Sequence, residues 1–214
     1  MASEERKMDK NRLEAFSDGV LAIVITIMVL ELTLPVGDTL KDFADIIPLL
    51  LTYALSFFFV AIYWVNHHIM FNITEKVNLK IIWANIVWLF VISLIPFTTA
   101  WAGKYPNSFT PLCVYFLDMA LACIVFHLMY LFILIEKKQK VKFGVRNIIS
   151  LIVYVAAAAV GGFCPIASFI VVSIVSLWWV IPEKRLWKKV AEQTIKESES
   201  AENCPKEQED DSKV

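Results

Sequence analysis

Apolar residues fall in long runs along most of this chain, and most charged residues fall between the runs. The runs cover residues 15–34, 46–65, 81–102 and 112–135. A helix of about 20 residues crosses the ~30 Å hydrocarbon core of a bilayer, because each residue adds ~1.5 Å. The pattern therefore predicts an all-α, polytopic membrane protein.

A further apolar run, residues 148–181, is too long for one span. Gly161, Gly162 and Pro165 interrupt it, and such residues break helices or end them. We expect two short helices joined by a tight turn, which gives six transmembrane helices. A single tilted and kinked helix is the alternative, since glycine and proline also occur within spans.

The basic residues predict the orientation of these spans. With six spans, all of the 20 basic residues except Lys41 and Lys104 fall on one side, and that side is cytoplasmic because basic loops resist translocation. Both termini are then cytoplasmic, whereas five spans would place the basic tail outside. Residues 1–182 form the six-helix membrane domain in this scheme. Residues 183–214 form a cytoplasmic tail, a basic interfacial helix followed by a disordered acidic segment.

Composition and motifs narrow the function. With 58% hydrophobic and 19% charged residues, the chain does not fit a soluble core or a nucleic-acid-binding protein. It carries no Gly-x-Ser-x-Gly, no His-Glu-x-x-His and no paired aspartates at useful depth, so we expect no enzyme and no cofactor. The lipid bilayer is the partner that the composition implies.

One face of the first run carries a stripe of mostly apolar residues at helical spacing, here called the first-helix stripe. Its members are Gly19, Ile23, Thr26, Ile27, Leu30 and Leu34. Packing against lipid or another helix would explain such a stripe. It could also line a pathway. Asp18 lies about 140° from Ile23 at 100° per residue, so it would face its own subunit.

Polar residues at the end of the second run supply partners for Asp18. Trp64, His67 and His68 reach the same side of the membrane as Arg12 and Asp18. A buried carboxylate needs such donors, and we expect His67 or His68 to contact Arg12 or Asp18. A metal site is the alternative, but adjacent histidines lack the i, i+4 spacing of a helical zinc site. We therefore expect a hydrogen-bond network and no metal.

Several residues together resemble a known signature. They are Arg12, Phe16-Ser17-Asp18-Gly19, Ala22-Ile23, Thr26 and Leu30, followed by His67-His68 and by Leu94-Ile95-Pro96-Phe97. This pattern is similar to that of the transmembrane protein 175 family of potassium channels. One six-span unit resembles the prokaryotic form of the family.

The resemblance implies a leak-type, potassium-selective channel in the plasma membrane. It implies a homotetramer whose first helices line a central pore. Ile23 would form the narrowest apolar constriction, Leu30 a second apolar layer, and Thr26 a polar ring between them, with Gly19, Ile27 and Leu34 on the same face. Such a neck selects potassium because potassium loses its water more cheaply than sodium. The remaining signature residues would form a structural network: Arg12, Phe16, Ser17, Asp18, Trp64, His67 and His68.

An alternative function uses the ionisable residues within the spans. Asp18, His67 and Asp118 could serve a proton-coupled or proton-permeable transporter. Such a carrier would need ionisable residues on the pathway face and preferably two related halves. Neither feature is visible in the sequence.

Overall fold

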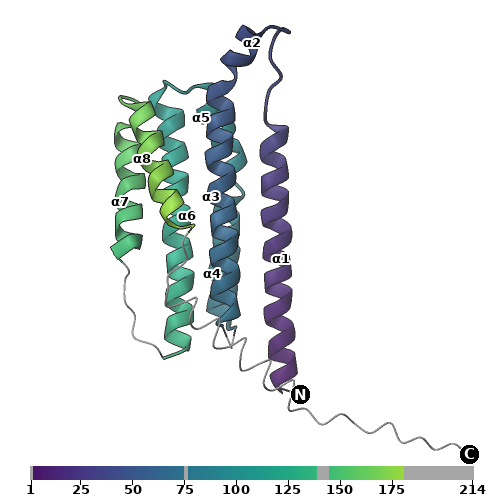
Figure 1. Cartoon of the computed structure of the whole chain (residues 1–214). Helices are drawn as coiled ribbons and strands as arrows, with labels where there is room; N and C mark the ends of the chain where they lie inside the picture. The colour runs from purple at the N-terminus through teal and green to yellow at the C-terminus, as the bar shows by residue number, and fades with distance from the viewer. Residues whose placement is uncertain (1, 75–76, 139–144, 181–214) are drawn as a thin grey trace, which may run out of the picture.

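A computed structural model describes residues 2–74, 77–138 and 145–180. Within them the chain is helical, and the long helices stand side by side in one bundle (Figure 1). The helices are α1 Ala2–Leu30, α2 Leu40–Asp45, α3 Ile47–Asn72, α4 Leu79–Ile92, α5 Ile95–Lys104, α6 Phe109–Glu136, α7 Val145–Val160 and α8 Pro165–Trp178. The predicted tail, residues 183–214, lies outside the described residues.

Length and composition allow membrane crossing for part of the bundle. Within the described residues, four stretches are long and apolar enough to cross a membrane: Lys10–Leu30, Ile47–Asn72, Leu79–Lys104 and Phe109–Glu136. α7 and α8 are apolar but have 16 and 14 residues, so each is shorter than a typical ~20-residue span. The all-helical, polytopic class is thus confirmed.

The last apolar run divides as its glycines predicted. α7 ends at Val160 and α8 begins at Pro165. A Cβ on Gly162 would lie 2.6 Å from the backbone of Phe109, so the turn packs too closely on α6 for any larger residue. The single kinked helix is therefore wrong.

The third run is not one straight helix. α4 ends at Ile92, and α5 begins at Ile95 with Pro96 in its first turn. Proline has no N–H for the preceding turn and clashes with its carbonyl. Here the ladder tightens, and Leu94 N–H donates to the Val91 carbonyl over 3.0 Å. Pro96 therefore accounts for the break between α4 and α5 at residues 93–94.

α1 differs from the expected first span at both ends. It begins at Ala2, thirteen residues before the apolar run, and ends at Leu30. Leu34 therefore lies beyond the helix, and the expectation that it continues the first-helix stripe at 100° per residue was wrong. Pro35 also keeps Leu34 out of helical geometry, because the residue before a proline avoids it.

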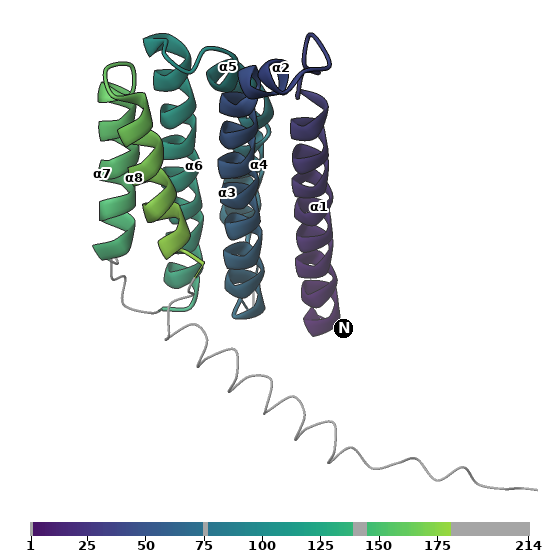
Figure 2. The ribbon, with the colours of Figure 1, turned by 45° about the horizontal axis from the view of Figure 1, so that its top comes forward.

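The core lies between α3, α4, α5 and α6. α6 packs against α4, α5 and α7, while α1 packs on the edge of the bundle against α3, α4 and α5. Figure 2 shows α1 at one margin and the α7–α8 pair at the other. The largest fully buried side chains come from α3, α4 and α6 and include Trp88, Phe71, Tyr115 and Phe116. α1 is thus held along one side only.

Candidate pore helix and the polar contacts that hold it

α1 has a covered face and an open face. The covered face is defined by Leu13, Ser17, Leu21, Val24 and Met28, all buried. The open face lies opposite and is defined by Phe16, Gly19, Ile23, Thr26, Ile27 and Leu30. Ile23 is 58% exposed and Leu30 is 80% exposed. The first-helix stripe, apart from Leu34, therefore has no cover within its own chain among the described residues.

Two residues on the open face have features that suit an enclosed pathway. Thr26 donates its hydroxyl hydrogen to the Ile23 carbonyl over 2.8 Å, which leaves the oxygen lone pairs directed outward as acceptors. A Cβ built on Gly19 would meet nothing within 4 Å, although glycine costs ~1 kcal/mol against alanine inside a helix. Nothing in the protomer therefore requires a glycine at this position.

A buried chain of hydrogen bonds, the lower polar cluster, ties α1 to the bundle. Ser17 Oγ donates to the Leu13 carbonyl over 2.8 Å and accepts from Asn85 Nδ2 at 2.9 Å. Asn85 Oδ1 lies 2.9 Å from His67 Nε2. Since that oxygen is the acceptor, His67 carries its proton on Nε2. α1, α4 and α3 are thereby joined through Ser17, Asn85 and His67.

His67 is fixed by stacking as well as by its hydrogen bond. Its ring lies 4.4 Å from that of Phe71 and 5.2 Å from that of Trp88, nearly parallel to both. Both rings and the imidazole are fully buried. The histidine therefore has one orientation, directed at Asn85.

Asp18 is held separately from this cluster. Trp64 Nε1 donates to Asp18 Oδ1 over 2.9 Å, and the Trp64 ring stacks on His68. His68 in turn lies 3.0 Å from Asn72 Nδ2. Asp18 thus takes its partner from its own chain.

The expected contact of a histidine with Arg12 or Asp18 was wrong. Asn85 on α4 stands between α3 and α1, and its amide takes the place of a direct contact between His67 and α1. Arg12 and Phe16 are exposed and lie apart from the lower polar cluster. Sequence reasoning missed the role of Asn85, although an amide within an apolar run is a signal that could have found it.

An upper polar cluster holds α5 against α3 and α6. Thr99 Oγ1 donates to Ser56 Oγ over 2.7 Å, and Tyr115 OH lies 2.9 Å from the same oxygen. Thr98 Oγ1 donates to Asp118 Oδ2 over 2.9 Å, while Asp118 Oδ1 is buried without a partner. Asp118 is thus part of the packing of α5 on α6.

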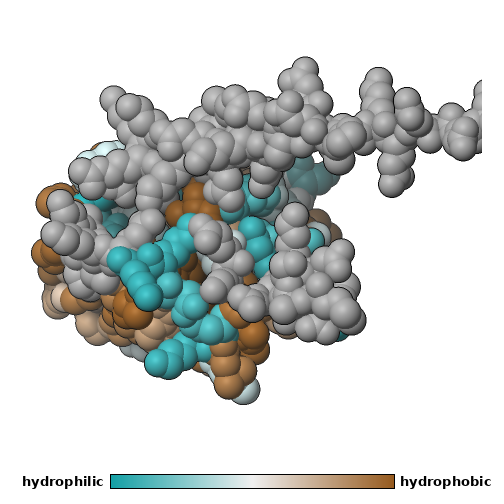
Figure 3. All heavy atoms as spheres, turned by 90° about the horizontal axis from the view of Figure 1, so that it is seen from below, coloured by the Kyte–Doolittle hydropathy of each residue, from teal (hydrophilic) through white to brown (hydrophobic). Residues whose placement is uncertain are grey.

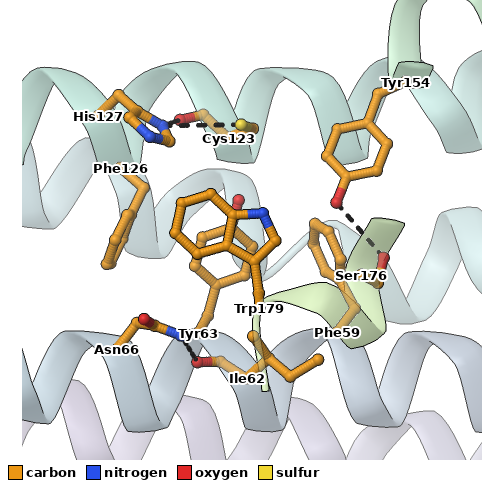
Figure 4. A pocket seen from close by; sticks show the side chains of 10 residues that line it. All are labelled: Phe59, Ile62, Tyr63, Asn66, Cys123, Phe126, His127, Tyr154, Ser176 and Trp179. Atoms are coloured by element: carbon orange, nitrogen blue, oxygen red, sulfur yellow. Dashed lines mark hydrogen bonds between the residues drawn. The ribbon is translucent and has the colours of Figure 1, made fainter. Parts of the chain in front are cut away.

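A small cavity lies on the other side of α3, away from α1. Figure 4 shows its lining residues, among them Tyr63, Asn66, His127 and Trp179. Its volume is about 20 Å³, which is room for about one water molecule. His127 Nδ1 lies 2.6 Å from the Cys123 carbonyl, so this nitrogen carries the proton and donates. The cavity is too small to be a substrate pathway.

Hydrophilic residues gather on the end of the bundle where α1 begins, as the view from below shows (Figure 3). The end of α3 and the start of α4 also lie at this end (Figure 1). Lys10, Arg12 and Lys80 belong to it by their positions in the chain. A polar end of this kind is typical of a helix bundle that meets water beyond a bilayer.

Comparison with known proteins identifies the family to which this chain is similar. The sequence profile of the family described as endosomal/lysosomal potassium channel TMEM175 matches residues 12–96. A potassium channel from Chryseobacterium sp. (strain P1-3) is 39% identical over 191 residues, 86% of this chain and 100% of that protein. The Rattus norvegicus endosomal/lysosomal proton channel TMEM175 is 26% identical over 126 residues, 56% of this chain and 25% of that protein.

A solved structure shares the fold. The crystal structure of a lysosomal potassium-selective channel TMEM175 homologue from Chamaesiphon minutus superposes with a TM-score of 0.69. The match covers 81% of this chain and 97% of the other at 24% identity. Together with the full-length bacterial relative, these findings show that the chain belongs to the TMEM175 family, a family of ion channels rather than of enzymes.

Proposed function

We propose that this protein is a potassium-selective channel of the plasma membrane, a homotetramer in which four α1 helices surround a central pore. The observation that carries the proposal is the open face of α1, where Ile23 is 58% exposed in a helix otherwise apolar enough to cross a membrane. Full-length similarity to a bacterial protein named as a potassium channel supports it.

Each residue of the open face has a role in this proposal. Ile23 forms the apolar constriction, Leu30 a second apolar layer, and Thr26 supplies acceptor oxygens between them. An apolar neck admits ions only when they lose water, and potassium loses it more cheaply than sodium. Gly19 and Ile27 line the wider parts of the same pathway.

The wider architecture follows from the basic residues and from the apolar pair α7–α8. In our proposal α7 and α8 are the fifth and sixth spans, with the bilayer thinned locally. Both termini are cytoplasmic, which places the hydrophilic end in Figure 3 at the inner surface. Residues 1–182 form the channel domain, and residues 183–214 form a cytoplasmic tail.

The signature residues Ser17 and Asp18 hold α1 in register through partners on α3 and α4. Ser17 acts through Asn85 and His67, and Asp18 acts through Trp64 and His68. Arg12 and Phe16 are exposed in the protomer and are assigned to contacts that form on assembly. No metal or cofactor is required for this function.

Proton permeation is a second candidate, because the rat relative is named a proton channel. The structure gives little support to a proton pathway through His67 and Asp118, two of the residues considered for it in the sequence analysis. His67 and Asp118 belong to different polar clusters. His67 bonds Asn85 on α4, and Asp118 bonds Thr98 on α5, so neither bond is directed at the open face of α1. Any protons would therefore pass through the same α1 pore.

Ion flux in liposomes tests the proposal. Purified wild-type protein should pass potassium down its gradient without a coupled solute. Ile23→Asn should lower the potassium-to-sodium permeability ratio by about tenfold, equivalent to ~1.4 kcal/mol of discrimination, because amides offer a partial hydration shell. Ile152→Asn is the matched control, since Ile152 on α7 is 61% exposed but far from α1.

Two results would contradict different parts of the proposal. Absence of potassium flux from well-folded wild-type protein would overturn the channel function. Unchanged reversal potentials in Ile23→Asn, with flux intact, would remove Ile23 from the constriction and leave the function standing.

A further inference from the structure

The α4–α5 pair carries an unpartnered apolar ridge. The α4–α5 ridge consists of Trp83, Val87, Phe90, Leu94 and Phe97, all exposed. Their spacing of four, three, four and three residues places them along one face, as in the seam of a coiled coil. Phe90 is 64% exposed and Phe97 is 63% exposed. These are large side chains that the protomer leaves uncovered.

α3 carries a second stripe with the same spacing but smaller residues. The α3 stripe consists of Leu51, Ala54, Phe58, Ala61 and Val65. Leu51, Phe58 and Val65 are exposed, and the two alanines leave hollows between them. Beside the upper part of this stripe, Leu51, Ala54 and Phe58 face Ile166, Ile170 and Ile174 of α8 across a groove of about 720 Å³.

The ridge and the stripe lie on different flanks of the bundle. α3 stands in front of α4 in both ribbon views, and α1 stands at the margin beside them (Figures 1 and 2). α3 and α4 both contact α1. α1 thus stands at the edge of the protomer, with the helix that carries the α3 stripe on one flank and the helix that begins the α4–α5 ridge on the other.

We propose that the α4–α5 ridge of each copy packs onto the α3 stripe of the next copy, with Phe97 entering the groove between α3 and α8. The inference rests on the proposed function, because it supplies the contacts that bring four α1 helices together. A ring needs two different surfaces on every subunit, one for each neighbour. The two flanks meet this requirement, and the helices that carry them contact α1.

Side-chain size favours this pairing. Within a bilayer, apolar burial gives little drive for association, since lipid is as apolar as the helix, and close packing of large residues on small ones decides it. The aromatic residues of the ridge, Phe90 and Phe97, meet a stripe that contains Ala54 and Ala61. Two ridges facing each other would place large side chains against large side chains, which pack less closely.

Hydrogen bonds within the protomer set the level of each residue along the bundle. His67 bonds Asn85 near one end, and Ser56 bonds Thr99 near the other. Ala61 lies between His67 and Ser56, so it stands at the level of residues 90–94. By the same interpolation Val65 stands at the level of Val87, and Phe58 at that of Phe97.

Rotation about an axis along the bundle preserves these levels. A residue of the α3 stripe therefore meets ridge residues at its own level in the neighbouring copy. The pairs Val65 with Val87 and Phe58 with Phe97 are the contacts that the proposal requires.

Disulfide crosslinking in membranes tests the pairing. In a background whose four native cysteines are replaced by serine, the proposal expects Val65→Cys with Val87→Cys, and Phe58→Cys with Phe97→Cys, to give dimers, trimers and tetramers on oxidation. A head-to-tail ring links every subunit to the next, so the ladder ends at the tetramer. Phe58→Cys with Ile152→Cys is the matched control and should give at least about tenfold less product.

A second measurement does not depend on cysteines. Phe97→Gln should reduce the tetramer fraction of purified protein at least about tenfold more than Ile152→Gln, because the two residues are similarly exposed in the protomer and only Phe97 lies on the proposed interface. Tetramer fraction is measured by light scattering or native mass spectrometry.

Three outcomes would overturn the pairing. Ladders that stop at dimers from Phe90→Cys alone would show ridge-to-ridge contact. Lipid retained in the α3–α8 groove, without crosslinks from either pair, would show that an acyl chain fills it. Crosslinks between Ile23→Cys copies, with potassium flux intact and neither flank pair linked, would exclude these flanks from the subunit interface. The proposed α1 pore would still stand. Loss of both flux and the Ile23→Cys crosslink would instead overturn the proposed function.

Discussion

α1 and α6 are both long apolar helices, yet the bundle covers them very differently. In the most apolar 18-residue stretch of α6, 56% of the residues are buried inside the protomer, and in that of α1 the share is 22%. α6 contacts neighbours on several sides, whereas α1 is held along one face. Similar hydropathy thus gives one helix that stabilises the subunit and one that is available for assembly.

The largest expected effect comes from removing a buried aromatic side chain of α6. Phe116 is fully buried, so Phe116→Ala should lower the free energy of unfolding by about 3–5 kcal/mol, the usual cost of deleting a buried aromatic ring. Leu30→Ala on the open face of α1 should change it by less than about 0.5 kcal/mol. Both are measured by tryptophan fluorescence in a denaturing-detergent titration of monomeric protein. Equal losses would contradict the contrast between the two helices.

Breaking the lower polar cluster should have an intermediate effect. Asn85→Ala leaves Ser17 and His67 buried with lost partners, which should cost about 1–3 kcal/mol of subunit stability. Asn72→Ala is the control, because Asn72 bonds His68 at an exposed position. We expect α1 to become more accessible to proteases or hydrogen exchange in Asn85→Ala. Unchanged protection of α1 would show that the cluster does not hold it.

Asp18→Ala should weaken the subunit less than Asn85→Ala. Trp64 is 45% exposed, so water replaces part of the lost bond, and we expect a cost of about 0.5–1.5 kcal/mol. Asp18→Asn keeps an acceptor oxygen and should restore most of this. The readouts are the yield of tetramer and the reversal potential. A selectivity change as large as that of Ile23→Asn would place Asp18 in the pathway.

The smallest effect concerns α2, which buries no residue. Its first turn is closed by a capping box in which Asp42 accepts from the Thr39 hydroxyl and backbone N–H. The Thr39 hydroxyl bond, the larger cause, and the backbone bond hold the pKa of Asp42 below its ordinary value.

The sign of this pH dependence follows from the depressed pKa. The cap stabilises α2 above the unfolded-state pKa of Asp42 and is lost as the pH falls through the lower folded-state pKa. Carboxyl chemical shifts in an NMR titration should show the low pKa, and Thr39→Ala should raise it towards the ordinary value, because only the backbone bond remains. A titration unaffected by Thr39→Ala would exclude the cap as its cause.

The sequence predicted what depends on local pattern. Gly161, Gly162 and Pro165 predicted the α7–α8 turn, because glycine and proline act on the backbone where they stand. The stripe on α1 was also visible, since helical spacing alone decides which residues share a face. The end of α1 was misplaced by four residues because the apolar run continues past it to Leu34.

Contacts between helices could not be predicted in the same way. The Ser17–Asn85 bond joins residues 68 apart, and the His67–Asn85 bond joins residues 18 apart. Which polar group meets which depends on how three helices pack, and several donors near Asp18 were equally possible from the sequence. Trp64 rather than a histidine was selected by the position of α3 beside α1.

The Ser17–Leu13 bond has a consequence for biogenesis. At about 5–20 residues per second, a ribosome needs roughly 3–14 s to add the chain between Ser17 and Asn85. During that delay the Ser17 hydroxyl is already bonded to the carbonyl one turn earlier in its own helix. α1 can therefore enter the membrane first and alone, with its serine satisfied, and wait for α4 without a chaperone for that group.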